Sequence, residues 1–156
     1  MQQRPRFAQR KSILRVSPRW ASIQALATLL LLWVTVDSSA ATCDAPAPVT
    51  FRPGAFAADV TGGVPRGLAD CWTVQARAGQ RVSAKVTSPE HNVVFQIYQP
   101  GWTTAEGAPA GQTLPGAGEG QDASVFSGIL PETGTYLFVL GTTRGGGDYR
   151  LRVKIR

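Results

Sequence analysis

Side chains that commonly catalyse reactions are scarce in this sequence of 156 residues. The single histidine, His91, lies between Glu90 and Asn92 just before an apolar segment, a setting typical of an exposed turn. The sequence contains no Gly-x-Ser-x-Gly motif, no cluster of paired carboxylates and no free thiol placed to pair with the histidine. These features predict a protein that acts by binding, without catalysis and without a cofactor.

Three side chains in two loops are the candidates for contact with a partner. Arg144 and Asp148 lie in a glycine-rich loop, 141–148, where a guanidinium can donate several hydrogen bonds at once. Trp102 lies near the start of a second loop, 99–121, which is rich in glycine and proline and is either a functional projection or a disordered spacer. The alternatives are a solvated arginine in a simple turn and a tryptophan folded back onto the protein.

Basic and apolar side chains alternate over residues 150–156. Successive side chains of a strand point to opposite faces, so four cations would share one face: Arg150, Arg152, Lys154 and Arg156. We hypothesise that this basic stripe meets an anionic polymer such as peptidoglycan, lipopolysaccharide or a surface glycan. The alternative is that these charges keep an exposed strand soluble and unpaired with neighbouring chains.

Much of the positive charge belongs to the N-terminus. The chain has 16 Lys+Arg, 10 Asp+Glu and a net charge of +6, but six of the basic residues and only one acid lie in the first forty positions. A basic stretch, an apolar run over 20–36 and small residues over 38–41 follow each other in the order of a secretory signal peptide. We therefore predict a cleavable signal peptide over 1–41 and export to a Gram-negative-type periplasm or to the medium. A retained membrane anchor is the alternative.

Removal of this segment would leave ten basic and nine acidic side chains, a nearly neutral protein. After cleavage we expect no association with the membrane. Nucleic acid is not an expected partner, because secretion removes it from reach and no aromatic residues are interleaved with a basic patch.

Export also decides how the two cysteines are interpreted. An even number of cysteines in an oxidising compartment favours a disulfide between Cys43 and Cys71. Two thiols and His91 would still leave a zinc site one ligand short, and the carboxylates are scattered, so no metal site is predicted. The disulfide would close a loop of about 28 residues and stabilise the fold by roughly 3 kcal/mol. A buried free Cys71 beside a mobile Cys43 is the alternative.

Short segments of alternating polarity separated by glycine turns make up the exported chain. All 17 glycines follow residue 40, which is too high a glycine content for a helix bundle. We predict a proline-rich leader over 42–48 and one domain over 49–156. Seven or eight short strands in that domain indicate an all-β fold, an antiparallel β-sandwich. The predicted strands span 49–52, 55–60 up to a glycine turn at 61–63, 71–76, 81–87, 93–98, 123–130, 135–140 and 149–155.

Several of these turns and strands together resemble a known family. They are the segment 76–80 before an alternating strand, the G-x-L-P-x-T-G-x-Y pattern of 128–136 and the Y-x-L-x-V pattern of 149–153. Over 49–155 the chain resembles the bacterial pre-peptidase C-terminal domain, in particular the single-domain periplasmic branch that includes inhibitors of g-type lysozyme. The resemblance implies a jelly-roll-like β-sandwich without catalytic activity. It also implies a lysozyme or another envelope-active protein as partner, bound by loops at one end of the sandwich, and Arg144 is the residue we assign to such a loop.

Overall fold

A computed structural model describes residues 43–156 of the chain, and the predicted signal peptide lies outside these residues. Within the described part, no helix is long and apolar enough to span a membrane. This part folds into ten strands. They are β1 (Ala47–Pro48), β2 (Ala57–Val64), β3 (Asp70–Ala76), β4 (Arg81–Thr87), β5 (Val93–Tyr98), β6 (Thr103–Ala105), β7 (Ala108–Ala110), β8 (Val125–Ile129), β9 (Gly134–Thr142) and β10 (Gly147–Ile155).

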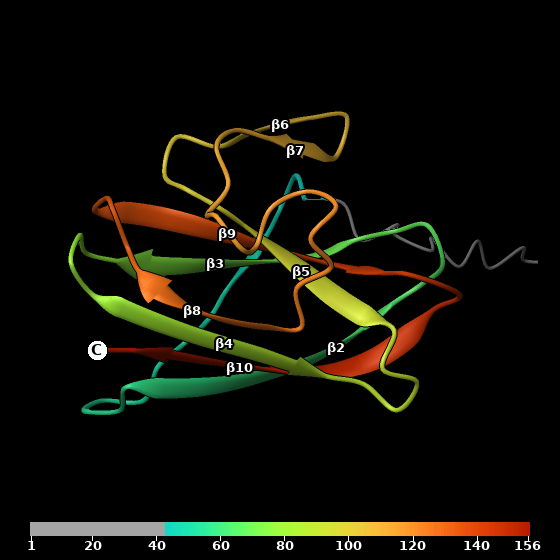
Figure 1. Ribbon diagram of the computed structural model, residues 1–156, viewed down its shortest axis with the longest axis horizontal. Coiled ribbons are helices and arrows are strands. Elements are labelled where there is room, and N and C mark those ends of the chain that lie inside the picture. The colour runs from blue at the N-terminus through green and yellow to red at the C-terminus, as the bar shows by residue number, and fades with distance from the viewer. Residues whose placement is uncertain (1–42) are drawn as a thin grey trace, which may run out of the picture. The chain divides into compact units, whose positions relative to one another are not determined.

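The strands form two four-stranded sheets and one small hairpin. Sheet A has the order β1-β3-β9-β5, sheet B has the order β2-β10-β4-β8, and β6 pairs with β7. The two sheets lie face to face, and the hairpin lies on the far side of sheet A (Figure 1). The predicted β-sandwich is confirmed. It is antiparallel apart from β1, which pairs with β3 in parallel.

Apolar side chains that alternate along the strands fill the space between the sheets. Strand β4 buries Val82, Ala84 and Val86 and exposes Arg81, Lys85 and Thr87, and β10 repeats this alternation over its whole length. From sheet A, the rings of Phe95 and Phe138 enter the same core with their centroids 6.2 Å apart. Period-two alternation places one apolar face on each strand, and burial of these faces drives the two sheets together.

A second and smaller core lies on the outer face of sheet A, beneath the β6–β7 hairpin and the first described residues. Cys43 and Cys71 form a disulfide there with their Cα atoms 5.3 Å apart, which confirms the predicted pair. The main-chain nitrogen of Cys43 donates a hydrogen bond to the carbonyl oxygen of Gly107 in the hairpin turn (3.3 Å). The N-terminal segment, sheet A and the hairpin are therefore joined. The members of this cluster are Cys43, Cys71, Tyr98, Leu137 and Val139, with Ala69 and Trp102 packed against them.

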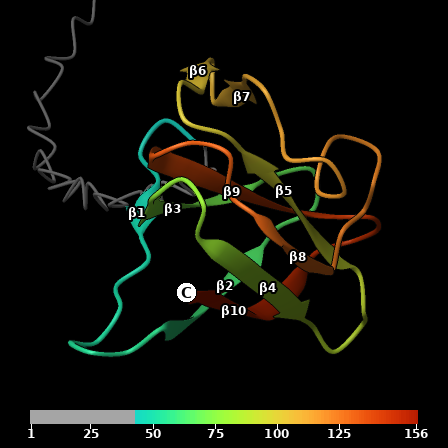
Figure 2. The ribbon, with the colours of Figure 1, turned by 60° about the vertical axis from the view of Figure 1, so that its left-hand side comes forward.

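The long loop 99–121 is ordered, so its interpretation as a disordered spacer is wrong. Its first half forms the β6–β7 hairpin, and its second half runs along β5. The amide of Ile97 donates to the carbonyl of Ala117 (2.9 Å), and the amide of Phe95 donates to that of Ala123, just past the loop (2.8 Å). The segment thus covers the main-chain edge that β5 would otherwise leave open at the border of sheet A. Figure 2 shows it passing beside β5 toward β8.

Two predicted strand boundaries are also wrong. Residues 49–52 form no strand; the pairing with β3 uses Ala47 and Pro48, within the segment predicted to be a leader. Strand β2 does not end at the glycines after Thr61 but continues to Val64, paired with β10 throughout.

Candidate functional site

Three loops meet at one end of the sandwich, on the right of Figure 1. They connect β2 to β3 (65–69), β4 to β5 (88–92) and β9 to β10 (143–146). A Cβ atom on Gly146 would lie 3.0 Å from the carbonyl oxygen of Val64, so the third loop touches the first. We call this group of loops the Arg144 end, because it presents the residue that the sequence singled out.

Asn92 fixes the conformation of the loop 143–146, which we call the Arg144 loop, from the buried side of that loop. Its side chain is almost fully buried, at 2 % exposure, and its amide nitrogen donates to the carbonyl oxygens of Arg144 (2.8 Å) and Gly146 (2.9 Å). The carbonyl of Asn92 in turn accepts a hydrogen bond from the amide of Thr143 (2.9 Å). A Cβ on Gly147 would lie 2.9 Å from the side-chain oxygen of Asn92, so a glycine is needed there. The glycine-rich loop is therefore held in one conformation by a buried amide.

Ser88 secures Asn92 itself. Its hydroxyl oxygen accepts hydrogen bonds from the amides of Asn92 (3.2 Å) and Val93 (3.3 Å), and the serine is buried. Side-chain oxygens that accept main-chain amides in this way stabilise tight turns. The turn carries His91 at its tip, exposed and with φ of 50°, as expected for a turn residue.

The side chain of Arg144 is exposed at the tip of its loop. Its Nη2 atom donates to the carbonyl oxygen of Glu90 in the neighbouring loop (3.1 Å), which leaves other guanidinium donors directed at solvent. Arg144 thus stands on a main chain that Asn92 holds in place, and its guanidinium has donors that are free to bind a partner. A loop of this kind can bind a carboxylate without a large loss of conformational entropy.

A polar junction between the sheets supports the Arg144 end. The hydroxyl of Tyr149 on β10 donates to the carboxylate of Asp70 and accepts a hydrogen bond from Nε1 of Trp72 (2.6 Å). Burial and the bond to Asp70 raise the pKa of Tyr149 above its usual range. A Cβ on Gly62 would lie 2.5 Å from the carboxylate of Asp70 and 2.6 Å from the hydroxyl of Tyr149, which explains why a glycine stands inside a strand here.

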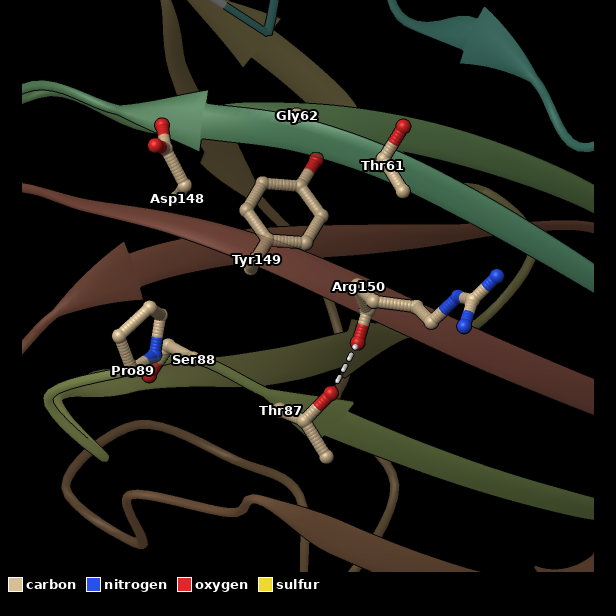
Figure 3. A pocket seen from close by; sticks show the side chains of 8 residues that line it. All are labelled: Thr61, Gly62, Thr87, Ser88, Pro89, Asp148, Tyr149 and Arg150. Carbon is tan, nitrogen blue, oxygen red and sulfur yellow. Dashed lines mark hydrogen bonds between the residues drawn. The ribbon is translucent and has the colours of Figure 1, made fainter.

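An open groove of about 570 Å³ begins beside this junction, on the outer side of sheet B. Figure 3 shows Asp148 at one end of the groove, the ring of Tyr149 in its floor and the guanidinium of Arg150 directed away along the sheet. The hydroxyl of Thr87 donates to the carbonyl of Arg150 across the groove (3.4 Å). Asp148 therefore lies near the Arg144 end, as its place in the sequence suggested.

Trp102 lies elsewhere. Its indole packs on the second core, and Nε1 donates to the carbonyl of Thr135 (3.0 Å). Thr135 stands at the start of β9 and Arg144 follows its end, so a strand of nine residues, roughly 25 Å, separates the two positions. The structure agrees with the alternative in which the tryptophan folds back onto the protein, and a partner contact through Trp102 stays a prediction.

The basic stripe lies on the solvent side of sheet B, but not on an edge. Strand β10 pairs with β2 on one side and β4 on the other, so its charges do not keep a free edge from pairing with neighbouring chains. The other part of that alternative, that they keep the exposed strand soluble, stays a prediction. Arg150 and Arg152 form ion pairs with Asp59 of β2, at 3.9 and 2.9 Å. These pairs are largely exposed, so each stabilises the fold by less than about 1 kcal/mol.

Within residues 43–156, no three cysteine, histidine or carboxylate side chains are grouped as metal ligands. No family model matches the sequence, and no curated protein does. Solved structures, in contrast, match it well. PliG of Aeromonas hydrophila, a periplasmic lysozyme inhibitor of g-type lysozyme, is 26% identical with a TM-score of 0.56, over 71% of this chain and 96% of that one.

The chain shares the fold of the PliG inhibitors. PliG of Salmonella Typhimurium matches with a TM-score of 0.52 and 21% identity over 71% of this chain and 97% of that one. A mutant of Escherichia coli PliG matches with the same TM-score and 19% identity, again over 71% and 97%. The resemblance inferred from the turn and strand motifs is therefore confirmed, and the alignment spans nearly the whole of each PliG chain.

Sequence reasoning missed the residues that shape the loops of the Arg144 end. Asn92 and Ser88 were passed over because a polar residue in a turn carries no signal of burial. Lys85 and Arg81 were not linked to the basic stripe, because only the pairing of β4 with β10 places them beside it. The sequence shows that the cations of β4 alternate with apolar residues, but it does not show that β4 pairs with β10.

Proposed function

We propose that this protein is a non-catalytic periplasmic inhibitor of a lysozyme and that it acts through the Arg144 end. The observation that carries the proposal is the shared fold with PliG of Aeromonas hydrophila, at 26% identity over 96% of that chain. That protein is a periplasmic inhibitor of g-type lysozyme, and an enzyme of this class is the first target to test.

The Arg144 end suits entry into a polysaccharide-cleaving cleft. Glycoside hydrolases carry catalytic Asp and Glu side chains in the cleft, and a guanidinium pairs well with a carboxylate. Arg144 is exposed, and Asn92 holds its main chain through two hydrogen bonds. In this mechanism Arg144 contacts an acidic group of the enzyme while the neighbouring loops close the cleft to substrate.

Inhibition of purified lysozymes tests the proposal directly. The exported protein is titrated against g-type, c-type and invertebrate-type lysozymes acting on cell-wall substrate, and we expect inhibition of at least one class. Micromolar excess without inhibition of any class would overturn the inhibitor function.

Arg144→Ala separates the site from the fold. We expect at least tenfold weaker inhibition, because truncation of a buried interfacial charge partner costs about 2 kcal/mol or more, with unchanged thermal unfolding. Arg77→Ala is the matched control, because Arg77 is also exposed but lies in the β3–β4 turn at the opposite end of the sandwich. Equal losses in both variants would exclude the Arg144 end as the binding site.

Periplasmic location is part of the same proposal. It is supported by the predicted signal peptide and by the Cys43–Cys71 disulfide, which suits an oxidising compartment. Cell fractionation followed by an intact mass under non-reducing conditions reports the location, the cleavage site and the disulfide together. A full-length, reduced chain in the cytoplasmic fraction would contradict this part of the proposal.

A further inference from the structure

The solvent side of sheet B concentrates positive charge. Six of the ten basic side chains among residues 43–156 lie on or directly beside this face: two from β4, three from β10 and one from Arg156, which follows β10. The acids on the same face are Asp59 and Asp148. The six cations are Arg81, Lys85, Arg150, Arg152, Lys154 and Arg156.

These cations line a continuous shallow groove along the seam between β4 and β10. The groove of Figure 3 is followed by three smaller hollows of about 230, 390 and 210 Å³. Each hollow shares with the next a pair of residues that face each other in the sheet, so the hollows form one track. The shared pairs are Thr87 with Arg150, Lys85 with Arg152 and Ser83 with Lys154.

The track has the length of a short polymer segment. Facing pairs repeat every second residue, about 7 Å along the strands. The series starts at Arg150 and ends where the main chains of Arg81 and Arg156 exchange two hydrogen bonds, of 2.7 and 3.0 Å. Three such steps give about 20 Å of cationic track.

The arrangement brings like charges directly opposite each other. Lys85 faces Arg152 in the register of the two strands, and Arg81 faces Arg156 at the end of the seam. Such pairs destabilise a sheet in the absence of a counterion. Asp59 supplies a counterion to Arg152, whereas no acid among the described residues forms an ion pair with Arg81 or Arg156. Solubility alone does not explain these like-charge pairs, because a surface with charges of both signs would be equally soluble without this repulsion.

Negative charge collects on other parts of the molecule. Glu106 lies in the turn of the hairpin that covers sheet A, and the carboxylate of Asp44 accepts a hydrogen bond from the amide of Gly107 in the same turn (3.2 Å). Sheet A thus separates these acids from the cationic face of sheet B (Figure 1). A protein that is nearly neutral in total carries a directional charge distribution, which orients it toward an anionic ligand.

We propose that the seam of β4 and β10 binds a linear anionic polysaccharide whose carboxylates meet the cationic track. Hydroxyls stand between the cations, from Ser83 and Thr87, and can hydrogen-bond to the hydroxyls of sugars. A lipid surface fits less well, because membrane-binding faces project apolar side chains among their cations. The exposed apolar residues of this face, Val125 (62 %) and Ile129 (53 %), face Lys85 and Arg81 across the β4–β8 pairing. They lie on the edge strand β8, outside the seam between β4 and β10, and the seam itself has no exposed apolar side chain among the described residues.

Binding to polygalacturonate, a soluble linear polymer of carboxylated sugars, and to isolated peptidoglycan sacculi tests the inference. The exported protein should bind both, with affinity that falls as salt is added, and should not bind neutral dextran. The triple variant Arg81→Ser/Lys85→Ser/Lys154→Ser should bind about tenfold more weakly, equivalent to about 1.4 kcal/mol. It spares the two arginines that are paired with Asp59.

Arg52→Ser/Arg66→Ser/Arg77→Ser is the matched control, since it removes the same charge from three exposed positions outside the seam. We expect its affinity to stay within twofold of that of the unmodified protein. Equal weakening of both triple variants, equal binding to dextran, or binding to phosphatidylglycerol vesicles but to neither polymer would each overturn the inference. The inference does not depend on lysozyme inhibition, because these assays contain no enzyme.

Discussion

Asn92→Ala tests whether a buried amide sets the conformation of the Arg144 loop. The substitution removes two hydrogen bonds, of 2.8 and 2.9 Å, to carbonyl oxygens of the loop. Each such bond contributes roughly 0.5–1.5 kcal/mol net, so we expect a loss of about 1–3 kcal/mol in the free energy of unfolding. For a domain of this size that loss lowers the midpoint of thermal unfolding by about 4–12 °C.

Asn92→Asp sharpens the test because it keeps the size of the side chain. A carboxylate would replace the amide donors with oxygens that face the carbonyls of Arg144 and Gly146. The unfavourable burial of this charge should make the loss of stability larger than in Asn92→Ala. The control is Gln75→Ala, which removes an exposed side-chain bond to Thr135 near the opposite end, and we expect it to cost less than about 0.5 kcal/mol.

Urea denaturation measures the stability of these variants, and hydrogen exchange of the 143–147 peptide reports opening of the loop. We expect faster exchange in this peptide and weaker lysozyme inhibition in both Asn92 variants. Unfolding curves and exchange rates equal to those of the unmodified protein would refute the role assigned to Asn92.

Three further predictions concern the fold that carries the loops. Gly62→Ala should lower the free energy of unfolding by about 1–3 kcal/mol through overpacking, because its Cβ would lie 2.5 Å from Asp70 and 2.6 Å from the hydroxyl of Tyr149. A free energy of unfolding in urea equal to that of the unmodified protein would contradict this packing. Tyr149→Phe should destabilise by a similar amount, since it leaves a carboxylate without its donor. Because the pKa of Tyr149 is raised in the folded state, the unfolded chain releases this proton first, and the stability of the fold falls above about pH 10. The stability of Tyr149→Phe should fall less steeply over the same pH range, and identical profiles of stability against pH would refute the assignment. Cys43→Ser/Cys71→Ser should lose roughly 3 kcal/mol, and calorimetry with an unchanged midpoint would show that the bond contributes nothing.

Strand positions were largely predictable from local patterns. The alternation over 81–87 and 149–155 correctly identified β4 and β10 and the face that each buries. The errors arose where a tertiary neighbour overrides the local signal. Two glycines suggested a turn after Thr61, but the first of them, Gly62, is explained by the nearby hydroxyl of Tyr149, which leaves no room for a Cβ atom. Strand β2 continues to Val64.

The candidate site was only partly predictable. Arg144 was identified from its loop of glycines, and Asp148 from its position at the end of that loop. The glycines suggested close approach to a partner, but at Gly147 the close approach is internal, to the side chain of Asn92. Contacts between residues 50 or more positions apart leave no pattern in a single sequence.

By itself, the sequence determined the class of the fold, the disulfide pair and the alternation that gives β10 a basic face, because these follow from local periodicity and from the redox chemistry of two cysteines. Tertiary structure alone decided that β10 lies in the middle of a sheet, with Lys85 and Arg81 beside its arginines. Periodicity fixes which face of a strand a side chain occupies, but strand order depends on long-range packing. That order turned a stripe on one strand into a cationic track shared by two.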